Sequence, residues 1–270
     1  MTRTINYNSK KVSQKYLWIA KMRLSIIIVI FNGEKHINKT IKSILNQNYK
    51  DFELIIIDGG STDNTIEIIK RLNSPMIRWI SEPDKGISDA FNKGIKLATG
   101  DYINFQGDGD GFINSNSISD LFTNLDLKER PIVCGNIQRI DIKGNLLYKT
   151  KINKRFNKKS LLFKMSLPHQ GLFIPKEFFA KHGEFDLNNK YCMDYELLLR
   201  AFHDFPKVIT KDLVVSNWRA DGLGEGKTLE ILKEYHKIKL KNKVASKPSL
   251  VVIHIYSIFK YYLKSFFKNF

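Results

Sequence analysis

The stretch LIIIDGGSTD at residues 54–63 decides the fold. Its four leading apolar residues are β-prone and consecutive, which predicts a strand buried on both faces, as in a parallel sheet. Asp58 stands where this strand ends, and the two glycines after it permit a tight turn that a ligand can approach closely. The Ser-Thr-Asp that closes the stretch supplies N-caps for a following helix. An acid at this point lies in the ligand crevice of open α/β sheets, or it only caps a strand–helix turn.

Three further apolar runs, at residues 24–31, 76–80 and 102–105, predict strands that alternate with amphipathic helices. Such alternation favours a doubly wound sheet with right-handed crossovers. We therefore predict an α/β fold with a Rossmann-like, mostly parallel central sheet flanked by helices.

The regular alternation stops after residue 111. A hairpin over residues 131–150, a helix over 192–202 and a late strand over 208–215 are expected there. The chain then divides into four parts: a basic N-terminal extension (1–23), two halves of one domain (24–111 and 112–216) and a C-terminal helical extension (217–270).

Composition and length are those of a globular protein, with 270 residues of which 43% are hydrophobic and 12% aromatic. Two cysteines, Cys134 and Cys192, lie outside any metal-ligand spacing, which points to a reducing compartment. No signal peptide is visible, and no run approaches the roughly 20 apolar residues that span a bilayer. We therefore expect a cytoplasmic protein.

The formal charge of +17 is concentrated in three segments. Residues 1–23 carry six Lys/Arg and no acid, residues 142–176 carry nine and no acid, and residues 217–270 carry eleven against four acids. This distribution favours docking onto an anionic surface over a uniformly solubilising charge.

The C-terminal segment is the strongest candidate for such docking. Residues 250–259 are dominated by apolar side chains, and Lys260, Lys264 and Lys268 follow at four-residue spacing among aromatic residues. The spacing places the lysines on one helical face, opposite the aromatic residues, which is typical of an interfacial helix on an anionic leaflet. The alternative is a helix packed on the domain. We expect a protein that is peripheral on the inner face of the cell membrane.

Asp108 and Asp110 form the sharpest chemical signal. They stand one residue apart in a glycine-flanked loop directly after the run 102–105. Oxygen ligands in this arrangement suit Mn²⁺ or Mg²⁺ shared with substrate phosphates. A plain Asp/Gly turn and a calcium loop are alternatives, although no glutamate follows at the spacing that an EF-hand uses.

Asp194 begins a predicted helix, where it is either a helix-terminus charge or a general base for an attacking hydroxyl. Glu196 points to another face, and we expect it to be structural. His169 and Gln170 follow a proline in a loop, where a lone histidine is commonly structural. Three charged residues surround the glycine that enters the third helix, either as a capped helix start or as contacts to ribose and phosphate: Asp84, Lys85 and Asp89.

Several stretches occur in the order of one family: LSIIIVIFNGEKHINKTIKSILNQNY, ELIIIDGGSTDNT, WISEPDKGISDAFNKGIKLATGDYINF, and HQGLFIPKEFFAKHGEFD with MDYELLLR. Over residues 24–219 the chain resembles bacterial family 2 glycosyltransferases of the polysaccharide and O-antigen branch. The resemblance implies a GT-A type fold and an inverting transfer of a sugar from a nucleotide diphosphate donor. It makes residues 24–111 the nucleotide-sugar-binding half and residues 112–216 the acceptor-binding half.

The resemblance also implies roles for single residues. Asp194 matches the acid that serves as base, and the Asp108–Asp110 pair matches the metal motif. His169 and Gln170 match a loop at the donor–acceptor junction. The nucleotide is matched by six positions: Phe31, Asn32 and Asp58 at the base, and Asp84, Lys85 and Asp89 near the ribose and diphosphate.

Two departures from the family pattern stand out. Relatives commonly have adjacent aspartates where this chain has Gly109 and Asp110, so Asp110 is the better metal ligand of the pair. Gly59 stands where many relatives have a second acid. UDP is favoured as the donor nucleotide because Asp58 can accept the N3–H of uracil, an argument that dTDP also satisfies. The expected acceptor is a glycan or a lipid-linked glycan.

Two other functions fit parts of the sequence. A nucleotidyltransferase that makes the sugar nucleotide would carry a glycine-rich, basic phosphate loop near its first strand, which residues 31–34 lack. A non-enzymatic nucleic-acid binder would suit the pI of about 9.7. The basic segments contain no recognisable nucleic-acid module, however, and the expected crevice is acidic, so we expect no nucleic-acid partner.

Overall fold

Four parallel strands form the first half of one central sheet in the computed structural model, which describes residues 22–268. Their order in the sheet is β3-β2-β1-β4. Side chains of β1 and β2 alternate between two hydrophobic clusters, and both strands are buried along their whole length. The apolar runs therefore form strands covered on both faces, as predicted. The bounds are β1 (Leu24–Ile30), β2 (Phe52–Asp58), β3 (Ile77–Ser81) and β4 (Tyr102–Gly107).

The second half of the sheet is mixed. β4 pairs antiparallel with β8, β8 pairs antiparallel with β6, and β6 runs parallel to β9. The predicted hairpin consists of β6 and β7, while the short β5 pairs with the end of β9. β9 is longer than predicted and continues to Arg219. The bounds are β5 (Gly111–Phe112), β6 (Ile132–Ile140), β7 (Leu146–Lys149), β8 (Leu172–Pro175) and β9 (Val208–Arg219).

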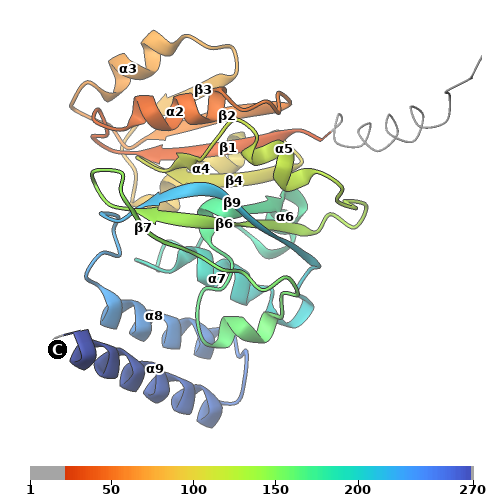
Figure 1. The fold of residues 1–270 in the computed structure, drawn as a ribbon, viewed down its shortest axis with the longest axis vertical. Helices are drawn as coiled ribbons and strands as arrows, with labels where there is room; N and C mark the ends of the chain where they lie inside the picture. The colour runs from red at the N-terminus through yellow and green to blue at the C-terminus, as the bar shows by residue number, and fades with distance from the viewer. Residues whose placement is uncertain (1–21, 269–270) are drawn as a thin grey trace, which may run out of the picture.

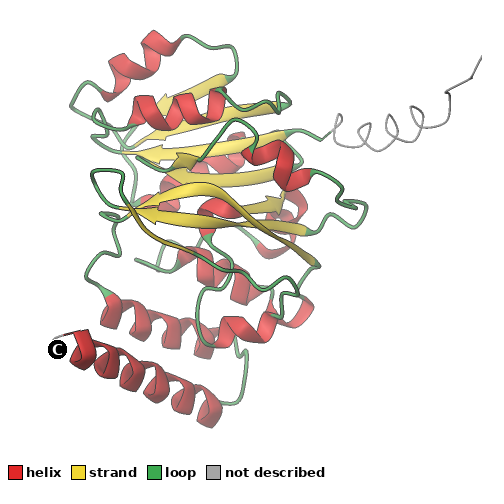
Figure 2. Cartoon of the chain, viewed as in Figure 1, coloured by secondary structure: helices red, strands yellow, loops and turns green. Residues whose placement is uncertain are grey.

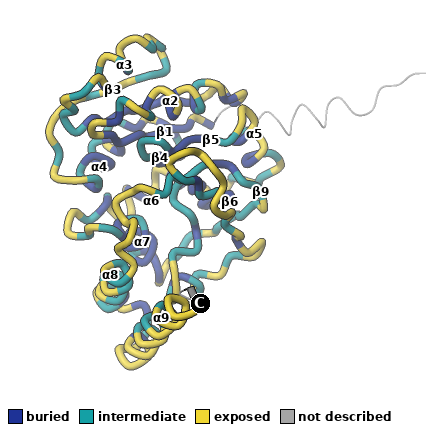
Figure 3. The backbone as a smooth tube through the Cα atoms, turned by 60° about the vertical axis from the view of Figure 1, so that its left-hand side comes forward, coloured by how far each residue is buried: buried dark blue, intermediate teal, exposed yellow. Residues whose placement is uncertain are grey.

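Helices cover both faces of the sheet, so the α/β prediction is confirmed (Figures 1 and 2). Three of them contribute side chains to one hydrophobic cluster, and three more contribute to the other together with the two C-terminal helices. Most of the sheet lies buried between them, although β3 and β7 are largely exposed, as are the outer sides of the helices (Figure 3). The first layer contains α2 (Ile37–Leu45), α3 (Thr65–Leu72) and α5 (Ser117–Phe122), and the second contains α4 (Ile87–Leu97), α6 (Lys176–His182) and α7 (Met193–Arg200).

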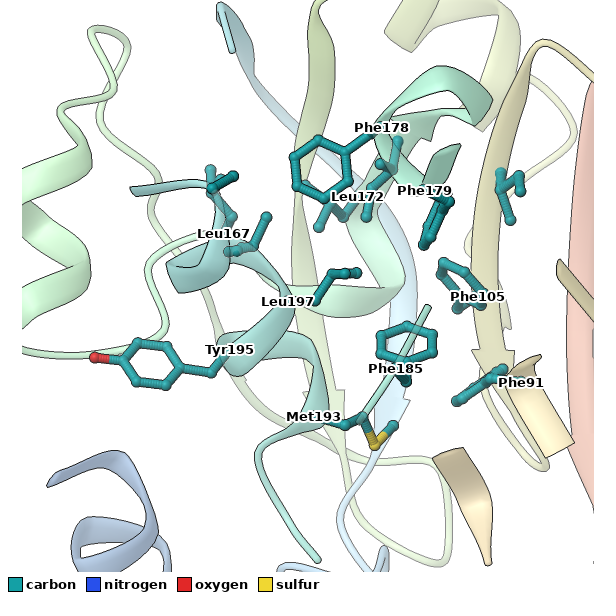
Figure 4. Packing of buried hydrophobic residues seen from close by; sticks show 14 of the residues in the cluster. Phe91, Phe105, Leu167, Leu172, Phe178, Phe179, Phe185, Met193, Tyr195 and Leu197 are labelled. Carbon is teal, nitrogen blue, oxygen red and sulfur yellow. The ribbon is translucent and has the colours of Figure 1, made fainter. Parts of the chain in front are cut away.

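A group of phenylalanines joins the two halves of the chain. The ring centroids of Phe91 in α4 and Phe105 in β4 lie 5.0 Å apart, and Phe185 lies 5.1 Å from Phe105. Figure 4 shows these three rings beside Met193, the first residue of α7. The packing therefore fixes the start of α7 relative to the carboxyl end of β4.

The C-terminal extension consists of α8 (Thr228–Lys241) and α9 (Lys247–Lys268), which pack against each other below α7 (Figure 1). Ile238 and Leu250 anchor them in the core, and the outer side of α9 is exposed (Figure 3). In residues 22–268, no helix is long and apolar enough to cross a membrane. The predicted basic extension lies outside the described residues up to residue 21, as does Phe270.

The packing of α8 on α9 is expected to weaken as the pH falls from about 7 to about 5. The rings of His236 and His254 stack 4.3 Å apart across this contact. Burial lowers the pKa of both histidines, and the neighbouring His236 and Lys239 lower the pKa of His254 further. Because the folded-state pKa of each histidine lies below its unfolded value, the unfolded chain binds more protons. The free energy of unfolding therefore decreases as the pH is lowered.

Thermal unfolding across this pH range measures the effect. His254→Phe keeps a stacked ring but removes one of the two titrating groups, so its Tm should depend less on pH than that of the wild type. Identical pH profiles for the two proteins would show that the stacked histidines do not cause the loss of stability at low pH.

Candidate active site

The candidate site lies where the carboxyl ends of β1, β2 and β4 meet. The loops after β1 and β2 are tied together by hydrogen bonds. The amide of Asn32 donates to Ser61 Oγ over 2.7 Å, and the amide of Thr62 donates to Asn32 Oδ1 over 2.9 Å. These contacts hold the glycine turn that follows β2 against the end of β1.

Asp58 is fully buried and holds this turn. Its carboxylate accepts hydrogen bonds from the amides of Gly60 and Ser61, at 3.0 and 2.9 Å, and from Ser81 Oγ at 2.6 Å. The carboxylate is thus occupied by protein donors and does not reach the surface of the cleft. These contacts are those of a tight strand–helix turn, and the role of Asp58 at the nucleobase stays a prediction.

Gly59 lies under two more of the sequence-predicted residues. A Cβ atom at this glycine would lie 2.5 Å from Asp84 Oδ2 and 3.5 Å from Phe31 Cδ2. The ring of Phe31 is 63% exposed. Asp84 and an exposed aromatic face therefore share the space that a side chain at position 59 would fill.

Carboxylates bind backbone amides in the segment just before α4, whose N-cap residue Gly86 has no side-chain cap. Asp84 Oδ1 accepts a hydrogen bond from the amide of Gly86 over 2.8 Å. Asp89 accepts one from the amide of Lys85 over 3.0 Å and lies 3.7 Å from Lys93 Nζ. The side chain of Lys85 is exposed and makes no ion pair with a described residue. The carboxylate of Asp89 therefore has partners within the protein and does not need a ligand to satisfy it.

Asp110 is buried and well supplied with hydrogen bonds. Its Oδ2 accepts from the amide of Gly107 at 3.0 Å and from Gln170 Nε2 at 2.9 Å, and its Oδ1 accepts from the amide of Arg219 at 2.9 Å. Burial raises the pKa of Asp110, and these hydrogen bonds act in the opposite direction. Gln170 thus supports the loop that carries Asp108 and Asp110, in addition to lining the site.

The carboxylate of Asp108 is less well supplied with hydrogen bonds than that of Asp110. Its Oδ1 is buried and has no hydrogen-bond partner among the described residues. Burial raises the pKa of Asp108 to about 6, with the guanidinium of Arg219 opposing the shift and Asp110 adding to it. A buried carboxylate with an unsatisfied oxygen is a group that a cation would stabilise.

Asp194 lies in the first turn of α7, with its side chain 22% exposed. Its Oδ1 accepts from the amide of Tyr195 at 2.8 Å, and its Oδ2 lies 3.9 Å from His169 Nδ1. The ring of His169 stacks on Phe105 and meets the edge of Phe91. Burial lowers the pKa of His169, so the imidazole is neutral at neutral pH.

One cavity of about 680 Å³ joins these groups. Asp108, Asp110, His169, Gln170 and Asp194 all line it, from both halves of the chain. The six predicted nucleotide-binding residues lie on the β1–β2–α4 side and do not line this cavity: Phe31, Asn32, Asp58, Asp84, Lys85 and Asp89.

The end of β9 also contributes to the site, which was not predicted from the sequence. Trp218 and Arg219 line the cavity, and so does the glycine-containing stretch that follows them, residues 220–226. Arg139 of β6 lies 4.4 Å above the ring of Trp218 and also lines the cavity. A polar and aromatic ending on a late strand, followed by three glycines within five residues, is the signal that was present in the sequence.

Comparisons with known proteins identify the family. The profile described as "Glycosyl transferase family 2" matches residues 25–182. A glycosyltransferase of Rickettsia typhi is 31% identical over 224 residues, which cover 80% of this chain and 70% of that protein. The chain therefore belongs to glycosyl transferase family 2, and it is a glycosyltransferase.

Solved structures agree on the fold. S. aureus TarS in complex with UDP-GlcNAc superposes with a TM-score of 0.66 at 15% identity, over 88% of this chain and 72% of that one. The mannosyltransferase PcManGT of Pyrobaculum calidifontis, in complex with GDP-Man and Mn²⁺, gives a TM-score of 0.63 at 16% identity, over 87% and 69%. The fold is of the GT-A type, as predicted.

Proposed function

We propose that the protein is an inverting glycosyltransferase that moves a sugar from a nucleoside diphosphate donor to a hydroxyl of a glycan or lipid-linked glycan. The observation that carries the proposal is the single cavity that joins the carboxylate pair of the metal loop to Asp194 of α7. An inverting transfer needs a base for the acceptor hydroxyl and stabilisation of charge on the departing diphosphate, and it needs no enzyme nucleophile. The cavity contains groups for both tasks and belongs to a family 2 enzyme.

Asp194 is the proposed base. Its Oδ2 is the oxygen that is free of backbone hydrogen bonds, and it faces the cavity side where His169 lies. The imidazole of His169 lies 3.9 Å from this carboxylate and is neutral, so it does not weaken the basicity of Asp194 as an adjacent imidazolium would. Asp194 would accept the proton from the acceptor hydroxyl as that oxygen attacks the anomeric carbon.

Asp108 and Asp110 fit a divalent cation, Mn²⁺ or Mg²⁺. The unsatisfied Oδ1 of Asp108 is the observation that favours it. In residues 22–268 no group of three or more His, Cys, Asp or Glu side chains could hold an ion alone, so the donor diphosphate would supply the remaining oxygen ligands. Such an ion would neutralise the charge of the departing diphosphate. A manganese ion accompanies GDP-Man in the PcManGT complex.

The nucleobase would bind over Gly59. Phe31 offers an exposed aromatic face, and Asp84 offers a carboxylate that can accept the N3–H of uracil or thymine. Asp58 and Asn32 would act indirectly by holding the turn, while Lys85 is exposed beside it and suits the ribose or phosphate. We favour UDP on these grounds; UDP-GlcNAc is the donor in the TarS complex.

Hydrolysis of a panel of UDP-, GDP- and dTDP-sugars with Mn²⁺ present tests the proposal. Turnover of one nucleotide class above the others is expected, and no turnover or binding of any sugar nucleotide would overturn it. The two alternatives make different predictions: a nucleotidyltransferase would release diphosphate from a nucleoside triphosphate, and a nucleic-acid binder would shift duplex DNA in a salt-dependent manner.

We further propose that α9 attaches the protein to an anionic membrane surface at the inner face of the cell membrane. By helical spacing, the side that packs on α8 carries Leu250, Ile253 and Ser257. Lys260 and Lys264 fall on the side of Ile253 and Ser257. The opposite side carries exposed apolar and aromatic side chains: Val252, Ile255, Tyr256, Phe259, Tyr262 and Leu263. A helix that is anchored on one side and apolar on the other suits the headgroup region of an anionic bilayer.

Flotation with anionic vesicles is expected to separate a double variant from the wild type. Phe259→Asp with Tyr262→Asp alters two side chains that are 62% and 57% exposed, so the fold should persist while vesicle binding falls at least about tenfold. Phe163→Asp, at an exposed phenylalanine outside α9, is the matched control and should float like the wild type. Equal flotation of all three proteins would show that α9 does not bind the bilayer.

A further inference from the structure

The end of β9 brings Arg219 onto the metal loop. Its amide donates to Asp110 Oδ1 over 2.9 Å, and its Nη1 lies 4.0 Å from Asp108 Oδ2. Its Nε donates to Asp221, and the side chain is only 17% exposed while lining the cavity. The amide of Arg219 thus contacts Asp110, and its guanidinium contacts Asp108 and Asp221.

The guanidinium has hydrogen-bonding capacity to spare. Among the described residues, Nη1 of Arg219 is buried without a hydrogen-bond partner, and so is Oδ1 of Asp108 beside it. An arginine is always charged and presents five N–H donors, so unsatisfied donors at this depth are costly. The two oppositely charged side chains lie 4.0 Å apart, and each has an unsatisfied polar atom. Anionic oxygens would satisfy the guanidinium, and a cation would satisfy the carboxylate.

Gly109 makes room for this arrangement. A Cβ atom at position 109 would lie 2.4 Å from Nη1 of Arg219 and 2.8 Å from its Cζ, and the backbone there has φ of +83°. This is the position at which the chain departs from the adjacent aspartates of the family pattern. A glycine in place of an acid lets a guanidinium sit directly on the loop, which exchanges a negative charge for a positive one.

We propose that Arg219 binds the diphosphate of the donor and stabilises its charge as it departs. This inference rests on the proposed function and deepens it. A divalent ion held by two carboxylates is formally neutralised by them, and Arg219, whose Nε is paired with Asp221, still offers its open Nη1 donor to the phosphates. Planar guanidinium donors match phosphate oxygens in geometry, and the contact would satisfy the open Nη donors.

Titration calorimetry with UDP, with Mn²⁺ and separately with EDTA, tests the proposal. Arg219→Gln should weaken UDP binding about ten- to a hundredfold, because a charge-assisted contact to phosphate is lost, and Arg219→Lys should lie between it and the wild type. Uridine lacks phosphates, so it should bind Arg219→Gln and the wild type equally. Ligand-observed NMR measures this binding. Arg155→Gln removes an exposed arginine that does not line this cavity, and should change UDP affinity less than about twofold.

Gly109→Ala provides a second route to the same result. Its methyl group would displace the guanidinium, so UDP affinity should fall as in Arg219→Gln, and the double variant should fall no further. Equal UDP affinity in Arg219→Gln and wild type would overturn the role of Arg219 and leave the glycosyltransferase proposal intact. Failure of the wild type itself to bind UDP or any sugar nucleotide would instead count against the proposed function.

Discussion

Asp194→Asn is expected to lower the rate of sugar transfer by about 10²- to 10⁴-fold while leaving donor binding within about twofold. Asparagine has the shape of aspartate and keeps an oxygen that can accept from the amide of Tyr195, so the first turn of α7 should stay in place. What is lost is the carboxylate that takes the proton from the acceptor hydroxyl. Because the change affects only the transition state, kcat and kcat/KM should fall together.

Product formation from a radiolabelled sugar nucleotide measures the rate, and calorimetry with UDP measures the binding. Asp204→Asn removes a carboxylate that is half exposed and pairs with Lys181, so it is a suitable control and should transfer at the wild-type rate. Normal turnover by Asp194→Asn would remove this residue as the base. Loss of UDP binding in the same variant would show that Asp194 acts on the donor instead.

The first half of the fold was predictable because its signals are local. In β1 and β2 every residue is buried, and the runs of isoleucine that produce this are contiguous in the chain. A buried parallel strand must end in a loop at the crevice edge, so the positions of the metal loop after β4 and of the turn after β2 follow from the same pattern.

The orientation of Asp58 was not predictable by that reasoning. A strand-end carboxylate can point into the turn or out to a ligand, and both need the same residue in the same place. The choice depends on Ser81, which comes from a neighbouring strand and donates to the carboxylate in the structure. Sequence pattern gives the residue, whereas its hydrogen-bond partners across the sheet give its role.

Arg219 was missed because its role depends on contacts distant in sequence. Its partner Asp110 lies 109 positions earlier in the chain, so the polar ending of β9 and its glycines could not be assigned to the loop of Asp108 and Asp110 from sequence alone. His169 is a similar case: its cage is built from α4, β4 and the loop before α7, so its burial could not be anticipated from a lone histidine after a proline.

Asp108→Asn and Asp110→Asn should both abolish the Mn²⁺-dependent part of UDP binding, because each removes a carboxylate from the only pair that the loop offers. Calorimetry with UDP should give the same affinity with Mn²⁺ and with EDTA in either variant. A persisting Mn²⁺ effect in both would show that the ion binds elsewhere, and a persisting effect in one would identify the other as the ligand.

Their effects on the metal-free fold should differ in sign. Burial raises the pKa of Asp108, and its Oδ1 has no partner in the described chain, so its charge destabilises the folded state at neutral pH and a neutral amide should raise the Tm by a few degrees. Asp110 accepts three N–H donors, and an asparagine amide would face one of them with a donor of its own, so Asp110→Asn should lower the Tm. A cation site that is costly without its ion predicts this contrast, whereas an ordinary Asp/Gly turn predicts that both substitutions destabilise.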